Sequence, residues 1–218
     1  MEIFFKKLTK LSPTLPSTIY KMVEEAGELN REILKFYPYM NLKKEDVMAN
    51  PDAKQALDYV VEELLDVAQT MATLLFVLED SGKLKFCPLS KLLDEHLMKL
   101  NRKNYKFVQN SSYFIKGSES ETRIALPRLL MHTDLVRTAL KIGEEAGELV
   151  QFAGKKSGMS GELNISDDTT ITKGIVSELF DVAQCCVTML YILEDLYDID
   201  IKSLLENHAS KLHEHGYC

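Results

Sequence analysis

One short acidic motif occurs twice in this chain of 218 residues and limits what the chain can fold into. The segment Glu-Glu-Ala-Gly-Glu-Leu occupies residues 24–29 and again residues 144–149. Each copy is followed by a second acidic segment, Glu-Leu-Leu-Asp-Val-Ala-Gln at 63–69 and Glu-Leu-Phe-Asp-Val-Ala-Gln at 178–184. The same motifs in the same order in both halves indicate an internal duplication, so one structural unit has to serve twice.

The spacing of apolar residues predicts three helices in each half. We expect the helices of the first half to begin near residues 16, 53 and 89, and those of the second half near 129, 175 and 208. The ranges are 16–36, 53–80, 89–107, 129–155, 175–196 and 208–217. A third segment also repeats, because His96, Lys99 and Tyr105 match His208, Lys211 and Tyr217 in register.

The prediction is an all-α fold in which two tandem helical units pack as a pseudo-dimeric bundle. The first repeat would span residues 1–110 and the second residues 128–218. The segment 111–127 would be a connector, because the helical periodicity lapses there and Ser, Gly and Asn punctuate it. A short hairpin between residues 105–108 and 113–116 is expected at this connector.

The repeated acids are candidate metal ligands. Each half offers Glu-x-x-Glu on one helix and Glu-x-x-Asp on another, and residues three apart share a helix face. Carboxylate oxygens are the hard ligands that Mg²⁺ and Mn²⁺ prefer. The eight candidates for metal binding and catalysis are Glu25, Glu28, Glu63, Asp66, Glu145, Glu148, Glu178 and Asp181.

A solvated helix face is the alternative explanation for such acids. The duplication argues against it, because the proposed ligands are kept in both halves while the neighbouring Glu32 is replaced by Phe152. Converging carboxylates would repel one another and raise some of their pKa values unless a cation relieved the repulsion. We therefore expect a cation site in each half.

Charge and cysteine content narrow the class of protein. The formal net charge of −7 argues against a general nucleic-acid binder, although a bound cation would still allow an anionic substrate. None of the four cysteines has metal-site spacing, which favours buried free thiols in a reducing compartment. The N-terminus lacks the features of a signal peptide, and the longest apolar runs are too short or interrupted to span a bilayer. We expect a cytoplasmic protein that binds no membrane.

Together, the two acidic helices and the closing His-x-x-Lys helix resemble the MazG-type all-α nucleoside triphosphate pyrophosphohydrolases. The resemblance covers nearly the whole chain, once per half. It implies Mg²⁺-dependent hydrolysis of a (deoxy)nucleoside triphosphate between its α- and β-phosphates, with the eight carboxylates holding the metal and one of them orienting water. It also implies dimers or tetramers with sites near subunit interfaces. The tandem arrangement departs from the family and allows either a pseudo-dimer of the two halves or a homodimer.

Basic residues are candidates for contacts with the substrate phosphates. The first half offers Lys99, Arg102 and Lys103, and the second half offers Lys155 and Lys211. The alternative is that these charges only solvate helix ends and interact with the helix dipole.

Other classes fit the sequence less well. A di-iron carboxylate bundle needs Glu-x-x-His pairs, and no histidine has Glu three residues before it. A P-loop enzyme is excluded because the chain lacks the glycine-rich Lys-Ser/Thr motif. A non-catalytic nucleotide-sensing or interaction module stays open, as does the related phosphoribosyl-ATP branch. The sequence does not distinguish the base or the sugar of the substrate.

Overall fold

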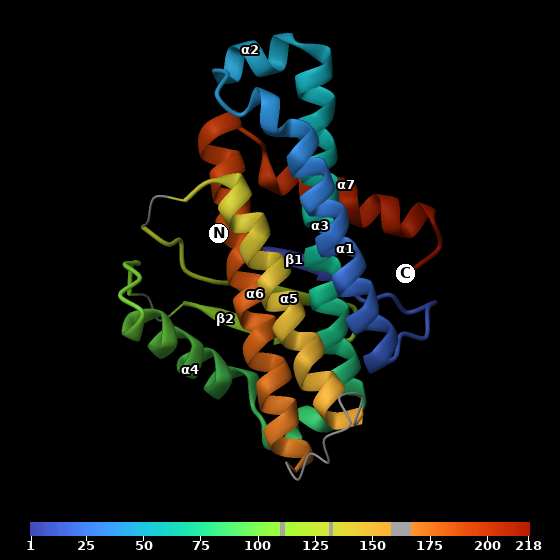
Figure 1. Cartoon of the computed structure of the whole chain (residues 1–218). Coiled ribbons are helices and arrows are strands. Elements are labelled where there is room, and N and C mark those ends of the chain that lie inside the picture. The colour runs from blue at the N-terminus through green and yellow to red at the C-terminus, as the bar shows by residue number, and fades with distance from the viewer. Residues whose placement is uncertain (110–111, 131–132, 158–166) are drawn as a thin grey trace.

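Four long helices form the body of the protein. The computed structural model describes residues 1–109, 112–130, 133–157 and 167–218, and for 155–157 only the backbone. Helix α1 (Leu15–Phe36) packs on α3 (Pro51–Asp80), and α5 (Leu135–Ser157) packs on α6 (Asp168–Tyr197). The two pairs meet through contacts of α1 with α5 and of α3 with α6 (Figure 1). The described chain is mostly helical, which confirms the predicted helical class.

Shorter helices surround this bundle. Helix α2 (Lys44–Ala49) and the 3-10 turn η1 (Tyr37–Tyr39) connect α1 to α3, and η2 (Lys83–Phe86) leads to α4. Helix α4 (Leu89–Arg102) packs against α6, whereas α7 (Ile201–Glu214) packs against the N-terminal strand. In Figure 1, α4 and α7 lie on opposite sides of the bundle.

A small antiparallel sheet corrects part of the sequence prediction. Its strands β1 (Ile3–Lys6), β3 (Glu121–Ala125) and β2 (Phe114–Gly117) are paired in the order β1-β3-β2. The predicted hairpin partner, 105–108, is wrong: β2 pairs with β3, and Phe107 forms an isolated bridge to Leu129. Strands of four or five residues are too short to show a clear alternation, so their pairing was not visible in the sequence.

Side-chain caps explain why some helix ends differ from those predicted. Helix α1 begins at Leu15 because Thr14 and Ser17 form a capping box. The last helix begins at Ile201 rather than at 208, because the Asp200 side chain accepts from the Ser203 amide at 3.2 Å. Helix α4 ends at Arg102 rather than at 107, and Asn104 beyond it has a φ of 61°. Helix α5 likewise starts at Leu135 rather than at 129.

The start of α3 gives a first testable prediction. The Asn50 side chain accepts hydrogen bonds from the amides of Asp52 at 3.0 Å and Ala53 at 3.2 Å. We expect Asn50→Ala to lower the free energy of unfolding by about 1 kcal/mol, measured by urea denaturation. Asn50→Asp keeps the acceptor and is the control. Equal losses in both variants would contradict the capping role.

The longest apolar helix lies in the core. By length and composition α6 could cross a membrane, since an 18-residue window of it has a mean hydropathy of 1.5. This corrects the prediction that the apolar runs are too short or interrupted for a span, because the run at 185–193 lies in this helix. However, 78% of that window is buried inside the protein, as in the core helix of a soluble protein. All four cysteines are free, as predicted, but only Cys87 and Cys186 are buried, whereas Cys185 and Cys218 are half-buried.

Candidate metal centres and their pockets

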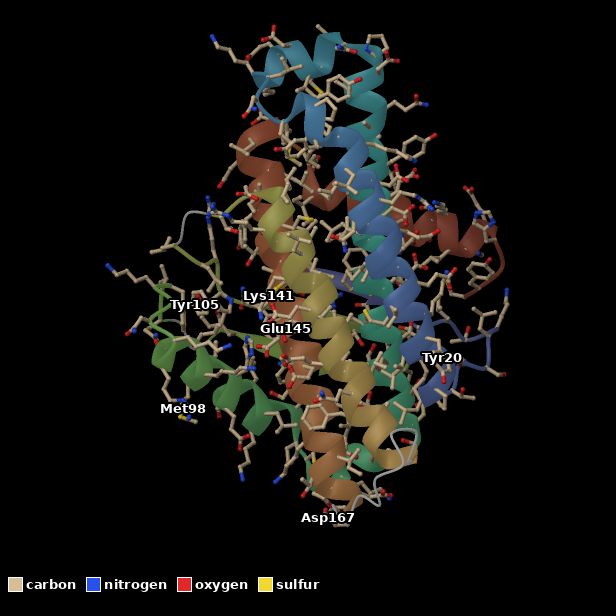
Figure 2. All side chains as sticks on the ribbon, viewed as in Figure 1. Tyr20, Met98, Tyr105, Lys141, Glu145 and Asp167 are labelled. Atoms are coloured by element: carbon tan, nitrogen blue, oxygen red, sulfur yellow. The ribbon has the colours of Figure 1, made fainter. Side chains whose placement is uncertain are left out.

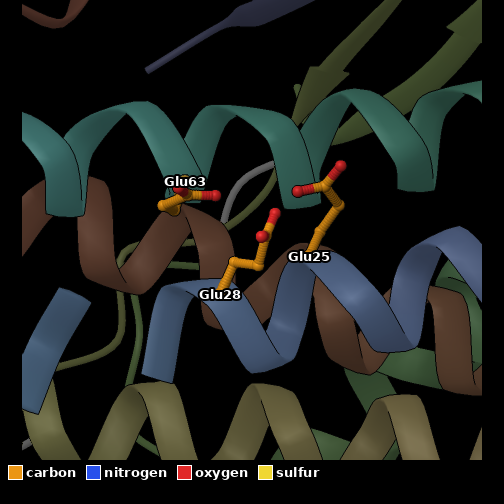
Figure 3. Close-up of side chains that lie close together, drawn as sticks. All are labelled: Glu25, Glu28 and Glu63. Atoms are coloured by element: carbon orange, nitrogen blue, oxygen red, sulfur yellow. The ribbon is translucent and has the colours of Figure 1, made fainter. Parts of the chain in front are cut away.

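The packing of α1 on α3 brings three acids of the first half together. Glu25 and Glu28 lie one turn apart on α1 and face Glu63 on α3 (Figure 3). One carboxylate oxygen from each lies within 4.8 Å of the others. We call this group centre one. Asp66 lies one turn beyond Glu63 and lines the adjoining cavity together with Glu25.

Centre one carries unbalanced negative charge. Burial raises the pKa of Glu63 to about 7, and the charges of Glu28, Asp66 and Glu25 add to the rise. The Arg31 guanidinium, 3.8 Å from Glu63, only partly opposes this effect. Burial also raises the pKa of Glu25, although Lys21 lies 2.6 Å away. A bound cation would relieve this repulsion among the acids.

The packing of α5 on α6 produces a matching group, centre two. It consists of Glu145, Glu178 and Asp181, again with one oxygen of each within 4.8 Å of the others. Burial raises the pKa of Glu178 to about 7 against the charge of Lys99, and Asp181 and Glu145 add to the rise. Glu148, the counterpart of Glu28, is exposed and lies outside this group.

Asp181 differs from its counterpart Asp66. Its carboxylate pairs with Lys99, and His96 Nδ1 lies 3.2 Å from its Oδ1. Burial acts to raise its pKa, but the hydrogen bonds and charges of His96 and Lys99 outweigh burial and hold the pKa below its ordinary value. The pKa of Asp66 is instead raised by burial, with Lys211 and Lys21 acting against the rise.

Each centre adjoins a cavity, which Glu25 lines at centre one and Glu145 and Asp181 line at centre two. The third helix of the other half and the residues just after it form part of each wall. The cavity at centre one has a volume of about 590 Å³, and the second half contributes His208, Lys211 and Tyr217 to its wall. The cavity at centre two has a volume of about 270 Å³, and the first half contributes Lys99, Lys103 and Tyr105. Figure 2 labels Tyr105 beside Lys141 and Glu145, which line this second cavity.

This exchange changes the placement of the predicted phosphate-binding residues. The sequence predicts Lys99 and Lys103 at the site of the first half and Lys211 at that of the second, but the structure places each at the opposite centre. Arg102 is exposed at the end of α4, outside the cavity lining. The side chain of Lys155 lies outside the described residues.

Some site residues escaped sequence reasoning. Lys21 and Lys141 stand four residues before Glu25 and Glu145 and pair with them at 2.6 and 2.5 Å. Gln69 and Gln184 line the two cavities. A signal existed, because each of these residues occupies the same place in both repeats.

The donor set suits a hard divalent cation. Both groups consist of carboxylates alone, which is the ligand type that Mg²⁺ and Mn²⁺ take. Glu178 Oε2 is buried without a hydrogen-bond partner in the described part of the chain, as expected of a ligand atom. Comparisons with protein-family models, curated proteins and solved structures found no match for this chain.

Proposed function

We propose that this protein is a Mg²⁺-dependent nucleoside triphosphate pyrophosphohydrolase that converts a (d)NTP to a (d)NMP and pyrophosphate; Mn²⁺ is a possible substitute. The observation that carries the proposal is the paired geometry, in which each group of three carboxylates adjoins a cavity that is lined by lysines and by two acids, Glu25 and Asp66 at centre one and Glu145 and Asp181 at centre two. A cation held by the acids and a lysine in the same cavity are complementary to a polyphosphate chain.

The resemblance of the motifs to the MazG-type enzymes supports the choice of the α–β bond. It also supports a pseudo-dimer of two MazG-like units, since α4 and α7 are exchanged between the halves as elements are between subunits. A cytoplasmic location belongs to the same proposal, and a homodimer is the alternative to the pseudo-dimer.

The residues of the two centres would have separate roles in binding the cation and the phosphates. Glu25, Glu28 and Glu63 would hold the cation at centre one, and Glu145, Glu178 and Asp181 at centre two. The bound cation would neutralise phosphate charge and lower the pKa of a bound water. Lys211 at centre one and Lys99, which pairs with Asp181 at centre two, would contact the phosphates.

Hydrolysis joins a water oxygen to the α-phosphorus and breaks its bond to the bridging oxygen, which leaves with pyrophosphate. A carboxylate of the centre would orient the water and accept its proton. Burial of the acids helps, because charge interactions are stronger where water is excluded. The cavity at centre one falls within the size range of small-molecule sites, and that at centre two lies just below it.

Product analysis tests the reaction. A panel of NTPs and dNTPs is incubated with Mg²⁺ and the intact protein, and the products are separated by ion-exchange chromatography. We expect monophosphate and pyrophosphate from the native protein and neither from the Glu63→Gln, Glu178→Gln double variant, which changes one acid in each centre. Diphosphate with inorganic phosphate would contradict the assigned cleavage site.

A nucleotide-sensing module is the second candidate, and Asp181 favours it at centre two. That carboxylate already pairs with Lys99 and His96, so a cation would have to compete for it. A protein that is stabilised by Mg²⁺ and nucleotide but releases no product would be a sensor.

A further inference from the structure

The matching lysines of the two repeats make different contacts at the two centres. Lys99 on α4 and Lys211 on α7 occupy the same place in their repeats, and each lines the cavity at the centre of the other half. Lys99 forms an ion pair with Asp181, the α6 acid of centre two. In the described part of the chain Lys211 forms no ion pair with the matching acid, Asp66, and its charge only opposes the rise in the pKa of that acid. The two centres therefore differ before any ligand binds.

Both carboxylate oxygens of Asp181 already have a neighbour that favours their negative charge. Oδ2 pairs with the Lys99 ammonium, and Oδ1 lies 3.2 Å from His96 Nδ1. Asp181 is 8% exposed and His96 is 4% exposed. Breaking an ion pair at such a buried carboxylate is costly unless another charged group replaces the lost partner.

The charge of Lys99 also acts on the other two acids of centre two. Burial acts to lower the pKa of Lys99, but the hydrogen bond and charge of Asp181, with the charges of Glu178 and Glu145, hold that pKa above its ordinary value. One positive charge is thus already associated with the three carboxylates that would hold a divalent cation. A second cation on Asp181 would be repelled by the ammonium, and the repulsion is strong where water is excluded.

Among the described residues, centre one has no comparable buried cation. Arg31 lies 3.5 Å from Glu28 and 3.8 Å from Glu63, and its side chain is 55% exposed. Such an exposed pair contributes little, because the long side chain is free to turn into water. Lys21 and Lys141 pair in the same way with the acid four residues after each of them, so they do not distinguish the two centres.

We propose that centre two binds its divalent cation tightly only together with the nucleotide, whereas centre one binds the cation tightly alone. This inference rests on the proposed function, which places the substrate phosphates beside the lysine of each cavity. A phosphate oxygen that accepts from Lys99 replaces Asp181 as the partner of the ammonium. Oδ2 of Asp181 is then free to act as a ligand atom, while His96 stays beside Oδ1.

This exchange couples the two ligands of centre two. The phosphates raise the affinity of the centre for the cation, and the cation must raise its affinity for the phosphates by the same factor. A free cation therefore occupies centre one first, and centre two is filled by the complex of cation and nucleotide. The lysine of centre two has two successive partners, first Asp181 and then the substrate.

Metal binding by proteins with one intact centre tests the difference between the centres. Free Mn²⁺ is measured by electron paramagnetic resonance during titration, without nucleotide, of Glu178→Gln, which keeps centre one, and of Glu63→Gln, which keeps centre two. We expect centre one to bind Mn²⁺ roughly tenfold more tightly. Equal affinities, or tighter binding at centre two, would overturn the inference.

Lys99→Met in the Glu63→Gln protein tests the exchange itself, because its two effects should have opposite signs. Without phosphates, the variant should bind Mn²⁺ roughly tenfold more tightly than its parent, since Asp181 has lost the competing ammonium. In calorimetric titration with the Mn²⁺ complex of inorganic tripolyphosphate, the same variant should bind roughly tenfold more weakly, since the phosphates have lost Lys99. A lysine with a purely structural role would shift both affinities in the same direction or neither, and that result would also overturn the inference.

Lys103→Met is the matched control in the same parent protein. Lys103 lines the same cavity, is exposed, and forms no ion pair with Asp181 among the described residues, so the Mn²⁺ affinity should stay close to that of the parent. If Lys99→Met does not fold, the comparison of the two single-centre proteins still decides. If neither of them binds Mn²⁺, both proposals fail. If both bind it equally and the native protein still releases monophosphate and pyrophosphate, only this inference fails.

Discussion

In a protein whose first centre is disabled by Glu63→Gln, we expect Lys99→Ala to reduce the remaining nucleotide hydrolysis about 100-fold, while Lys211→Ala leaves it unchanged. The remaining activity belongs to centre two, and Lys99 reaches that centre from the first half to pair with Asp181. Removing the lysine leaves the phosphate charge of the substrate without its cationic partner. Lys211 lines the cavity at centre one, so its removal takes no contact away from centre two.

The reciprocal background is the control. With centre two disabled by Glu178→Gln, Lys211→Ala should be the damaging change and Lys99→Ala the neutral one. Steady-state rates of pyrophosphate release, with kcat and KM determined separately, measure all four combinations. If each lysine instead supported the centre of its own half, the exchange of α4 and α7 would not describe the active protein.

In the absence of divalent cations, we expect the melting temperature of the native protein, relative to the Glu63→Gln, Glu178→Gln double variant, to fall as the pH rises from about 4.5 to about 7. The ordinary pKa of these glutamates is 4.5, and in the folded protein both rise to about 7. In this window the folded state binds more protons than the unfolded state, so stability falls with rising pH. The contribution is fully present below about 4.5 and is lost above about 7.

The double variant is needed because other groups titrate in the same range. Burial, with Lys211, lowers the pKa of His208 to about 4 from its ordinary 6.5, and that shift makes stability rise with pH. Both proteins share His208, so the difference between their melting curves isolates the glutamates. At pH 8 without metal the variant should melt roughly 2–4 °C higher than the native protein, and at pH 4.5 the difference should disappear.

With added Mg²⁺ at pH 8, the native protein should melt at a higher temperature than the double variant. At pH 8 the cation should raise the melting temperature of the native protein, because binding to the folded state relieves the repulsion among the acids. The double variant should respond much less, since each centre has lost a charged ligand. Equal responses of the two proteins would show that Mg²⁺ does not bind at these centres.

The sequence predicted the features that depend on local periodicity. The apolar spacing placed the long helices, and the three-residue spacing of Glu25 and Glu28 placed both carboxylates on one face of α1. The duplication indicated that an acid on a second helix would join Glu25 and Glu28, and Glu63 on α3 lies beside them. Helix ends and short strands were harder to predict from the sequence. A single capping side chain can set where a helix ends, and pairing with a distant strand determines whether a short strand forms.

Matching residues of the two motif copies do not always occupy matching positions in the structure. Glu148 repeats Glu28 in sequence, yet Glu28 joins centre one while Glu148 is exposed. Their surroundings differ, because Arg31 lies 3.5 Å from Glu28 and the second half has Gln151 at that position. A motif lists possible ligands, and the neighbouring helices select among them.

By itself the sequence determined a duplicated helical unit with two acidic helices in each half, because helix periodicity and repetition are local properties of a chain. Only the tertiary structure decided that α4 completes centre two and α7 completes centre one. Because the two halves carry the same motifs, a third helix could cover its own acids or those of the other half with a similar pattern. The choice depends on long-range packing, through α4 on α6 and α7 on β1, which no local pattern records.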